Sequence, residues 1–150
     1  MNNYVITINR QFGSLGRPIA RKMSEMLDIE YYDRDIVDSV AKEMDLPVSV
    51  VSDEEETAKS NYFNMKFPLG NGTTAMQQNI FEAQRRIISN LADRENCIIV
   101  GRCSDYILRN HPSLIRVFIY APKDVRFKNC VDNLHMSPEH AKKMITDVDK

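Results

Sequence analysis

Short apolar runs and helix-like apolar repeats alternate along this chain. Runs at residues 5–9, 29–32, 97–100 and 115–120 are typical of strands, and the run at 97–100 is continuous, as in buried parallel strands. Between the runs, apolar residues recur at helical spacing. This spacing predicts helices at about 17–27, 33–44, 74–93, 104–109, 122–133 and 137–150, and another that begins at Pro47. The alternation predicts an α/β domain with a mainly parallel sheet and helices on both faces.

Composition narrows the class of protein. The 150 residues, 43% of them hydrophobic, suit one globular domain. A net charge of -1 gives no indication of a nucleic-acid or membrane partner, and no apolar run approaches the ~20 residues that a membrane helix needs. Because the first predicted strand starts at residue 5, we expect no secretory leader, and the three cysteines include no CxxC pair. We therefore expect a cytoplasmic protein with reduced thiols.

The first predicted strand leads into a glycine loop that suits a phosphate group. Residues 13–17 read Gly-Ser-Leu-Gly-Arg, and Pro18 favours the start of a helix there. Glycines let backbone N–H groups approach an anion, and the helix N-terminus adds about half a positive charge. The P-loop motif places Lys and then Ser or Thr after its second glycine, and this chain has neither. A tight strand-to-helix turn is therefore the alternative interpretation.

Charged segments follow three of the predicted strands. Residues 13–17 follow the first strand, Asp33-Arg34-Asp35 the second, and Gly101-Arg102 the run at 97–100. The carboxyl ends of parallel strands lie at one edge of a sheet, where ligands bind. Together the segments predict a site for an anionic ligand at this edge. Each has a structural alternative: Asp33 is also placed to cap the next helix, and Arg102 could be a surface ion-pair partner.

These segments resemble a known family in their order and spacing. Residues 8–17, 31–34 and 99–102, followed by 117–122, look like the cytidylate kinase-like proteins, a divergent branch of the P-loop nucleoside monophosphate kinases. The resemblance covers nearly the whole chain. It implies one P-loop domain of three α/β/α layers that transfers the γ-phosphate of ATP to a (d)CMP-like acceptor, with Mg²⁺ bridging the donor phosphates.

The resemblance also implies roles for individual residues. The donor triphosphate would be held by Gly13, Ser14, Leu15, Gly16 and Arg17. The acceptor would be bound by Asp33, Arg34, Arg102 and Asp105, with a helical acceptor-binding insertion at about residues 34–93. Arg17 and Arg102 would be the catalytic cations, because a guanidinium offers paired donors to phosphate oxygens. Ser14 would be the substitute ligand for Mg²⁺.

Departures from the family pattern leave the activity open. Pro18 stands in the region where authentic cytidylate kinases have the hydroxyl residue of the motif, and Cys103 stands where they have a base-reading aspartate. Cys103 is expected to be a small buried residue. The sequence also stops where the family's arginine-rich lid and last strand are expected, so transfer should be slow.

Two other functions therefore stay open. The chain could bind a nucleotide or another phosphate ligand without catalysis. It could also be an interaction module that forms a homodimer through the apolar loop 62–67 and the helix 74–93.

Overall fold

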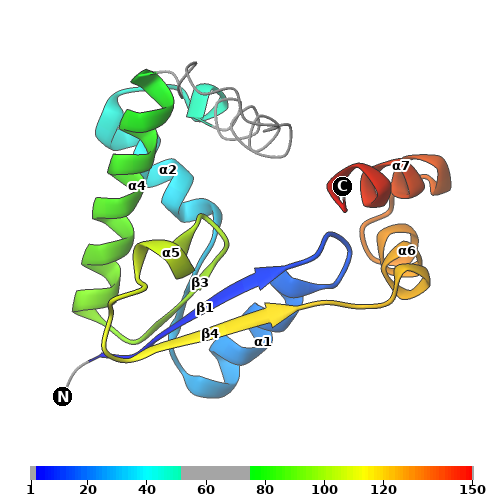
Figure 1. Cartoon of the computed structure of the whole chain (residues 1–150), viewed down its shortest axis with the longest axis horizontal. Coiled ribbons are helices and arrows are strands. Elements are labelled where there is room, and N and C mark those ends of the chain that lie inside the picture. The colour runs from blue at the N-terminus through cyan, green and yellow to red at the C-terminus, as the bar shows by residue number, and fades with distance from the viewer. Residues whose placement is uncertain (1–2, 52–74, 150) are drawn as a thin grey trace.

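A parallel sheet of four strands organises the part of the chain that the computed structural model describes, which is residues 3–51 and 75–149. The order across the sheet is β2-β3-β1-β4, and every pair of neighbouring strands is parallel (Figure 1). The strands are β1 (Val5–Arg10), β2 (Glu30–Tyr32), β3 (Cys97–Val100) and β4 (Leu114–Ile119). The predicted α/β class is confirmed, and all four predicted strands are present.

Helices cover both faces of this sheet, as the alternating pattern predicts. On one face, α1 (Gly16–Leu27) packs through Ala20 against Ile6, Ile8, Ile98 and Val100. On the other face lie α2 (Arg34–Met44), α4 (Ala75–Arg94) and the short α5 (Ser104–Ile107). Their buried apolar side chains pack against Val5, Cys97 and Ile99. Because β1 and β3 are covered on both faces, their apolar residues are buried almost completely.

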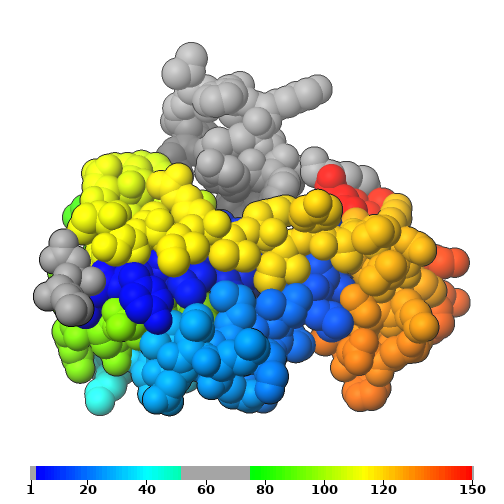
Figure 2. Space-filling view, turned by 90° about the horizontal axis from the view of Figure 1, so that it is seen from below, coloured from blue at the N-terminus to red at the C-terminus, as the bar shows by residue number. Residues whose placement is uncertain are grey.

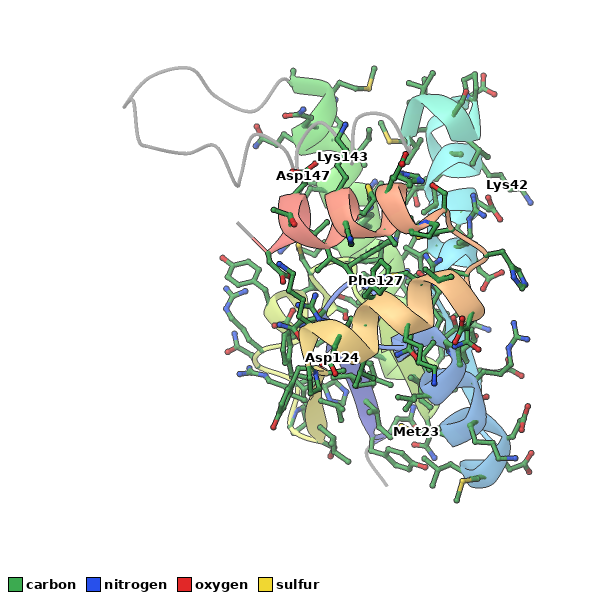
Figure 3. The ribbon with its side chains drawn as sticks, turned by 90° about the vertical axis from the view of Figure 1, so that its right-hand side faces the viewer. Met23, Lys42, Asp124, Phe127, Lys143 and Asp147 are labelled. Atoms are coloured by element: carbon green, nitrogen blue, oxygen red, sulfur yellow. The ribbon has the colours of Figure 1, made fainter. Side chains whose placement is uncertain are left out.

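The last two helices lie beyond the carboxyl ends of the strands. They are α6 (Lys123–Asp132) and α7 (Pro138–Val148), and they pack on each other through Cys130, Ala141 and Ile145 (Figures 1 and 3). Phe127 lies between them, and Phe12 from the loop after β1 joins the same cluster. The helix pair is therefore in direct contact with the predicted phosphate loop.

The cap of α7 follows from local sequence. Ser137 is the N-cap, and its hydroxyl accepts a hydrogen bond from the backbone N–H of His140. Pro138 occupies the first helical position, where its missing N–H leaves no hydrogen bond unmade.

Strand β4 forms an exposed edge of the sheet. It pairs with β1 from Val5↔Leu114 to Arg10↔Ile119 and has no strand on its other side among the described residues. Figure 2 shows this segment, in yellow, along the surface beside β1. Phe118 is 61% exposed, and Ile115 and Tyr120 are also exposed. An edge of this kind can pair with another chain.

Several boundaries differ from the sequence prediction by one or two residues. Helix α1 starts at Gly16 rather than Arg17, and α5 ends at Ile107 rather than Arg109. The predicted cap at Thr74 and the apolar loop 62–67 lie outside the described residues. None of the described helices is both long and apolar enough to cross a membrane.

Candidate functional site

The loop between β1 and α1 has a fixed, left-handed backbone at two points. Gly13 has φ 77°, and Leu15, at the N-cap position of α1, has φ 62°. Gly13 is also tightly packed, since an added Cβ would lie 2.8 Å from Cys130 Sγ and 2.9 Å from the Arg126 carbonyl oxygen. Glycine is therefore required here both for its backbone angle and for space.

Ser14 ties the loop to the end of the sheet. Its side chain is buried, and Oγ lies 2.8 Å from the Gln11 carbonyl oxygen and 3.2 Å from that of Ile119. The hydroxyl has one proton to donate to these two acceptors. Its contact with Mg²⁺ remains a prediction, and such a contact would have to coexist with this bracing of the loop.

Helix α6 holds the loop from the other side. Asn129 Nδ2 donates to the Gly13 carbonyl oxygen at 3.0 Å, and Arg126 Nη1 donates to that of Phe12 at 3.3 Å. Arg126 is only 3% exposed and forms a two-point ion pair with Asp149. Hydrogen bonding within the pair raises the pKa of Arg126 and lowers the pKa of Asp149.

Asp33 faces the loop from the end of β2 and is buried, at 4% exposed. Although it occupies the N-cap position of α2, its carboxylate makes no capping hydrogen bond, so the capping prediction is wrong. Instead Oδ2 forms an ion pair with Nε of Arg17, whose side chain is 54% exposed. The other oxygen, Oδ1, is buried and finds no hydrogen-bond partner among the described residues.

The turn after β3 is strained. Gly101, Arg102 and Cys103 have φ values of 68°, 57° and 53°, and residues other than glycine rarely adopt such values. The Gly101 N–H donates to the Ile8 carbonyl oxygen at 3.0 Å, which joins this turn to β1. Cys103 is exposed, so the prediction that it is buried is wrong. Strained backbone of this kind clusters at functional sites.

Arg10, which the sequence analysis missed, connects these segments. A Cβ on Gly16 would lie 2.6 Å from Arg10 Cγ, and a Cβ on Gly101 would lie 2.5 Å from Arg10 Nη1. Its side chain thus crosses from the loop to the turn after β3. Burial lowers the pKa of Arg10, the Asp33 carboxylate opposes that shift, and the nearby Arg17 and Arg102 add to it.

The structure therefore brings most of the predicted residues to one edge. Residues 13–17, Asp33 and Arg102 meet there, with Arg10 among them. Arg34 is exposed at the first position of α2, and Asp105 is half-buried in the first turn of α5. In the part of the chain that the structure describes, three arginines lie near this carboxylate, and such a group of guanidinium donors suits a ligand with more than one negative charge.

Two further residues that contact the loop between β1 and α1 were not predicted from the sequence, and both belong to α6. Arg126 and Asn129 are three positions apart, so they lie on one face of the helix. Their spacing is visible in the sequence, but their contact with the loop depends on where the helix lies.

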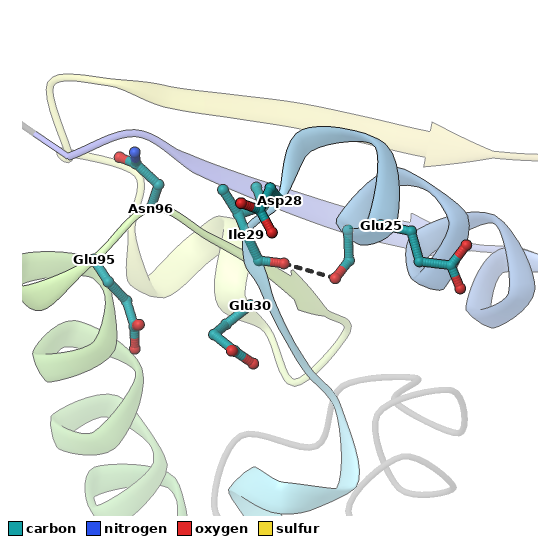
Figure 4. A pocket seen from close by; sticks show the side chains of 7 residues that line it. Glu25, Asp28, Ile29, Glu30, Glu95 and Asn96 are labelled. Carbon is teal, nitrogen blue, oxygen red and sulfur yellow. Dashed lines mark hydrogen bonds between the residues drawn. The ribbon is translucent and has the colours of Figure 1, made fainter.

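A separate pocket lies at the opposite end of the sheet (Figure 4). Its volume is about 450 Å³, and its lining includes Glu25, Asp28, Glu30 and Glu95. Ser24 Oγ donates to the Ile29 carbonyl oxygen beside it, at 2.6 Å. Carboxylates repel phosphate, so this pocket does not suit a nucleotide.

Comparison of the sequence with models of known families shows the family of this chain. The model of the cytidylate kinase-like family matches residues 5–150. The chain belongs to the cytidylate kinase-like family. No curated protein matches the sequence.

Solved structures with this fold include kinases. An uncharacterized protein from Eubacterium ventriosum has a TM-score of 0.68 and 26% identity, covering 98% of this chain and 71% of that one. A gluconokinase from Sinorhizobium meliloti has a TM-score of 0.55 and 14% identity, covering 99% of this chain and 77% of that one. A shikimate kinase from Acinetobacter baumannii, in complex with shikimate, has a TM-score of 0.51 and 11% identity, covering 96% of this chain and 75% of that one. The two kinases show that this cytidylate kinase-like chain has a P-loop kinase fold.

Thiol reactivity tests the strained turn of this family member. Cys103 is exposed, whereas Cys97 and Cys130 are fully buried, and burial raises the pKa of Cys97 to about 12 and also raises that of Cys130. We expect iodoacetamide at pH 8 to alkylate Cys103 well before the other two, because only thiolates react. Peptide mass spectrometry over time would measure this. Equal rates at all three cysteines in the folded protein would contradict the placement of Cys103.

Proposed function

We propose that this chain is a nucleoside monophosphate kinase-like phosphotransferase, which moves the γ-phosphate of ATP to a (d)CMP-like acceptor. The supporting observation is the meeting of a glycine loop, a buried carboxylate and several arginines at the carboxyl edge of a parallel sheet. Membership of the cytidylate kinase-like family supports the same reaction class.

The donor and the acceptor would occupy opposite sides of this edge. Backbone N–H groups of residues 13–17 and the Arg17 side chain would hold the triphosphate. Arg102 would grip the acceptor phosphate, while Arg34 and Asp105 would contact the rest of the acceptor. The orphaned Oδ1 of Asp33 would accept a hydrogen bond from an acceptor hydroxyl or amino group. The predicted acceptor-binding insertion at about residues 34–93, of which 52–74 lie outside the described residues, would enclose the acceptor.

The reaction needs mainly position and positive charge. An oxygen of the acceptor phosphate forms a bond to the γ-phosphorus as the bond to the bridging oxygen breaks, and ADP leaves. Arg17 and Arg102 would neutralise charge on the oxygens around the transferring group.

The described residues fit the phosphates better than a directly bound cation. Counting along the P-loop motif, Arg17 stands at the Lys position and Pro18, which has no hydroxyl, at the Ser/Thr position. Ser14 Oγ is already engaged with two carbonyls, and the Asp33 carboxylate is paired with Arg17 and acts electrostatically on Arg10. Magnesium, when bound with a nucleotide, supplies charge neutralisation between the donor phosphates. Here it would be held chiefly by the nucleotide, with Ser14 Oγ as the candidate protein ligand.

The lack of a Lys and of a hydroxyl residue at the P-loop motif positions favours one alternative, a protein that binds nucleotide without efficient turnover. A second alternative is a homodimer, favoured by the exposed Ile115, Phe118 and Tyr120 at the β4 edge. Light scattering would detect the dimer directly.

A ligand panel separates these functions. We expect ATP with Mg²⁺, and CMP or dCMP, each to raise the unfolding temperature, because ligands that bind only the folded state stabilise it. GTP and UMP serve as base controls, and a coupled assay of ADP release reports turnover. Stabilisation without ADP release would support the binder. No stabilisation by any nucleotide would refute both nucleotide functions.

Protection of Cys103 gives an independent check on the acceptor side. CMP should slow its alkylation, since Cys103 directly follows Arg102 in the strained turn. ATP alone should slow it less. Identical protection by both ligands would contradict the assignment of this turn to the acceptor.

A further inference from the structure

The side chain of Arg10 lies between the two segments that the proposed function assigns to donor and acceptor. Its aliphatic part lies against Gly16, at the start of α1, and its guanidinium lies against Gly101, directly before Arg102. A Cβ at either glycine would come within 2.6 Å of an Arg10 side-chain atom. The absence of side chains at both positions therefore leaves open a path that Arg10 occupies.

Among the described groups that act on Arg10, cations outnumber carboxylates. The groups that act on it include two cations, Arg17 and Arg102, and one carboxylate, Asp33. That carboxylate is already ion-paired with Arg17. Tyr31, also nearby, has a raised pKa and is neutral at pH 7. Guanidinium groups that lie close together repel one another, so an anion bound among them would relieve that repulsion.

Arg10 is also held in place more firmly than Arg17. It is the last residue of β1, whose backbone is paired with β4 up to Ile119. Its side chain is partly buried, whereas that of Arg17 is mostly exposed. A guanidinium held on a strand end loses less freedom when it binds an anion than one at an exposed helix start.

We propose that Arg10 is a phosphate-binding residue, which donates hydrogen bonds to the phosphate group shared between the donor loop and Arg102. Its role in transfer rests on the proposed function, whereas its binding of phosphate does not. In the transfer it would contact the γ-phosphoryl oxygens before and after the P–O bond to the acceptor forms, and it keeps its proton throughout.

Binding of inorganic tripolyphosphate tests this role without a base or an acceptor. We expect Arg10→Met, which keeps an unbranched apolar stem over Gly16, to weaken binding about ten- to a hundredfold. Arg10→Lys should recover part of the loss, because it restores the charge but not the paired donors. The matched control is Arg116→Met, since Arg116 is exposed on β4 and equally cationic. That control should bind within about twofold of the wild type.

Each outcome separates the two hypotheses. If the wild type binds tripolyphosphate and Arg10→Met binds it equally well, the role of Arg10 is refuted and the proposed function stands. If the wild type does not bind it, the phosphate site itself is refuted, together with the role of Arg10. If, in Arg10→Met and Arg10→Lys alike, binding falls only to the extent that the unfolding temperature without ligand falls, Arg10 is only a structural residue.

Kinetics add a readout of the transfer step. With ATP and CMP, Arg10→Met should lower kcat about tenfold or more, with a smaller change in the KM for CMP. A change in the KM for CMP alone would place Arg10 on the acceptor side only and contradict the shared position.

Discussion

Replacement of Gly13 by alanine is expected to lower the free energy of unfolding by about 2–5 kcal/mol. A left-handed backbone costs a residue with a Cβ about 1–2 kcal/mol, and overpacking adds about 1–3 kcal/mol. Gly13 has φ 77°, and the new methyl group would press on Cys130 Sγ and on the Arg126 carbonyl oxygen. The latter belongs to the helix backbone, so it cannot simply rotate away. Urea denaturation would measure the change.

Gly101→Ala is the matched control for this prediction. Gly101 also has a left-handed backbone, with φ 68°, but its added Cβ would meet the end of the flexible Arg10 side chain. It should therefore incur mainly the backbone cost of about 1–2 kcal/mol. Equal destabilisation by the two substitutions would mean that the contact between Gly13 and α6 is not tight.

Replacement of Arg102 by alanine is expected to weaken acceptor binding about ten- to a hundredfold, while the affinity for ATP stays nearly unchanged. A hydrogen bond to a charged group contributes about 1.5–3 kcal/mol, which corresponds to that loss. The expectation follows from the position of Arg102 in the strained turn after β3, on the far side of Arg10 from the donor loop. Calorimetric titration with CMP and with ATP would measure both affinities.

The control for Arg102 removes a positive charge elsewhere. Arg85 is exposed on α4, where it pairs with Glu82 three residues earlier. Arg85→Ala should leave both affinities nearly unchanged, since exposed ion pairs contribute little. Loss of ATP and CMP affinity in equal measure for Arg102→Ala would contradict its assignment to the acceptor.

The helices and strands were predictable because their signals are local. The continuous apolar run at Cys97–Val100 is typical of a buried strand, and Ser137 with Pro138 marked the start of α7. The edge at which Gly13–Arg17, Asp33 and Arg102 meet was also predictable. Parallel strands place their carboxyl ends together, whatever lies between them in the chain.

The partners of individual side chains were not predictable in the same way. Asp33 has the sequence position of a helix cap, yet its carboxylate pairs with Arg17 from another element. Arg10 lies in the segment 8–17 that carries the family resemblance but received no role, and its importance emerges only from its contacts with Gly16 and Gly101.

The sequence by itself determined the α/β class, the order of the elements and the edge at which charged segments gather. These depend on apolar periodicity and on turn residues, which act over a few positions. Only the tertiary structure decided that α6 holds the loop through Arg126 and Asn129. It also decided that the Arg10 side chain crosses from this loop to the turn after β3. Contacts between different elements depend on how the helices and strands pack, and local patterns do not encode that packing.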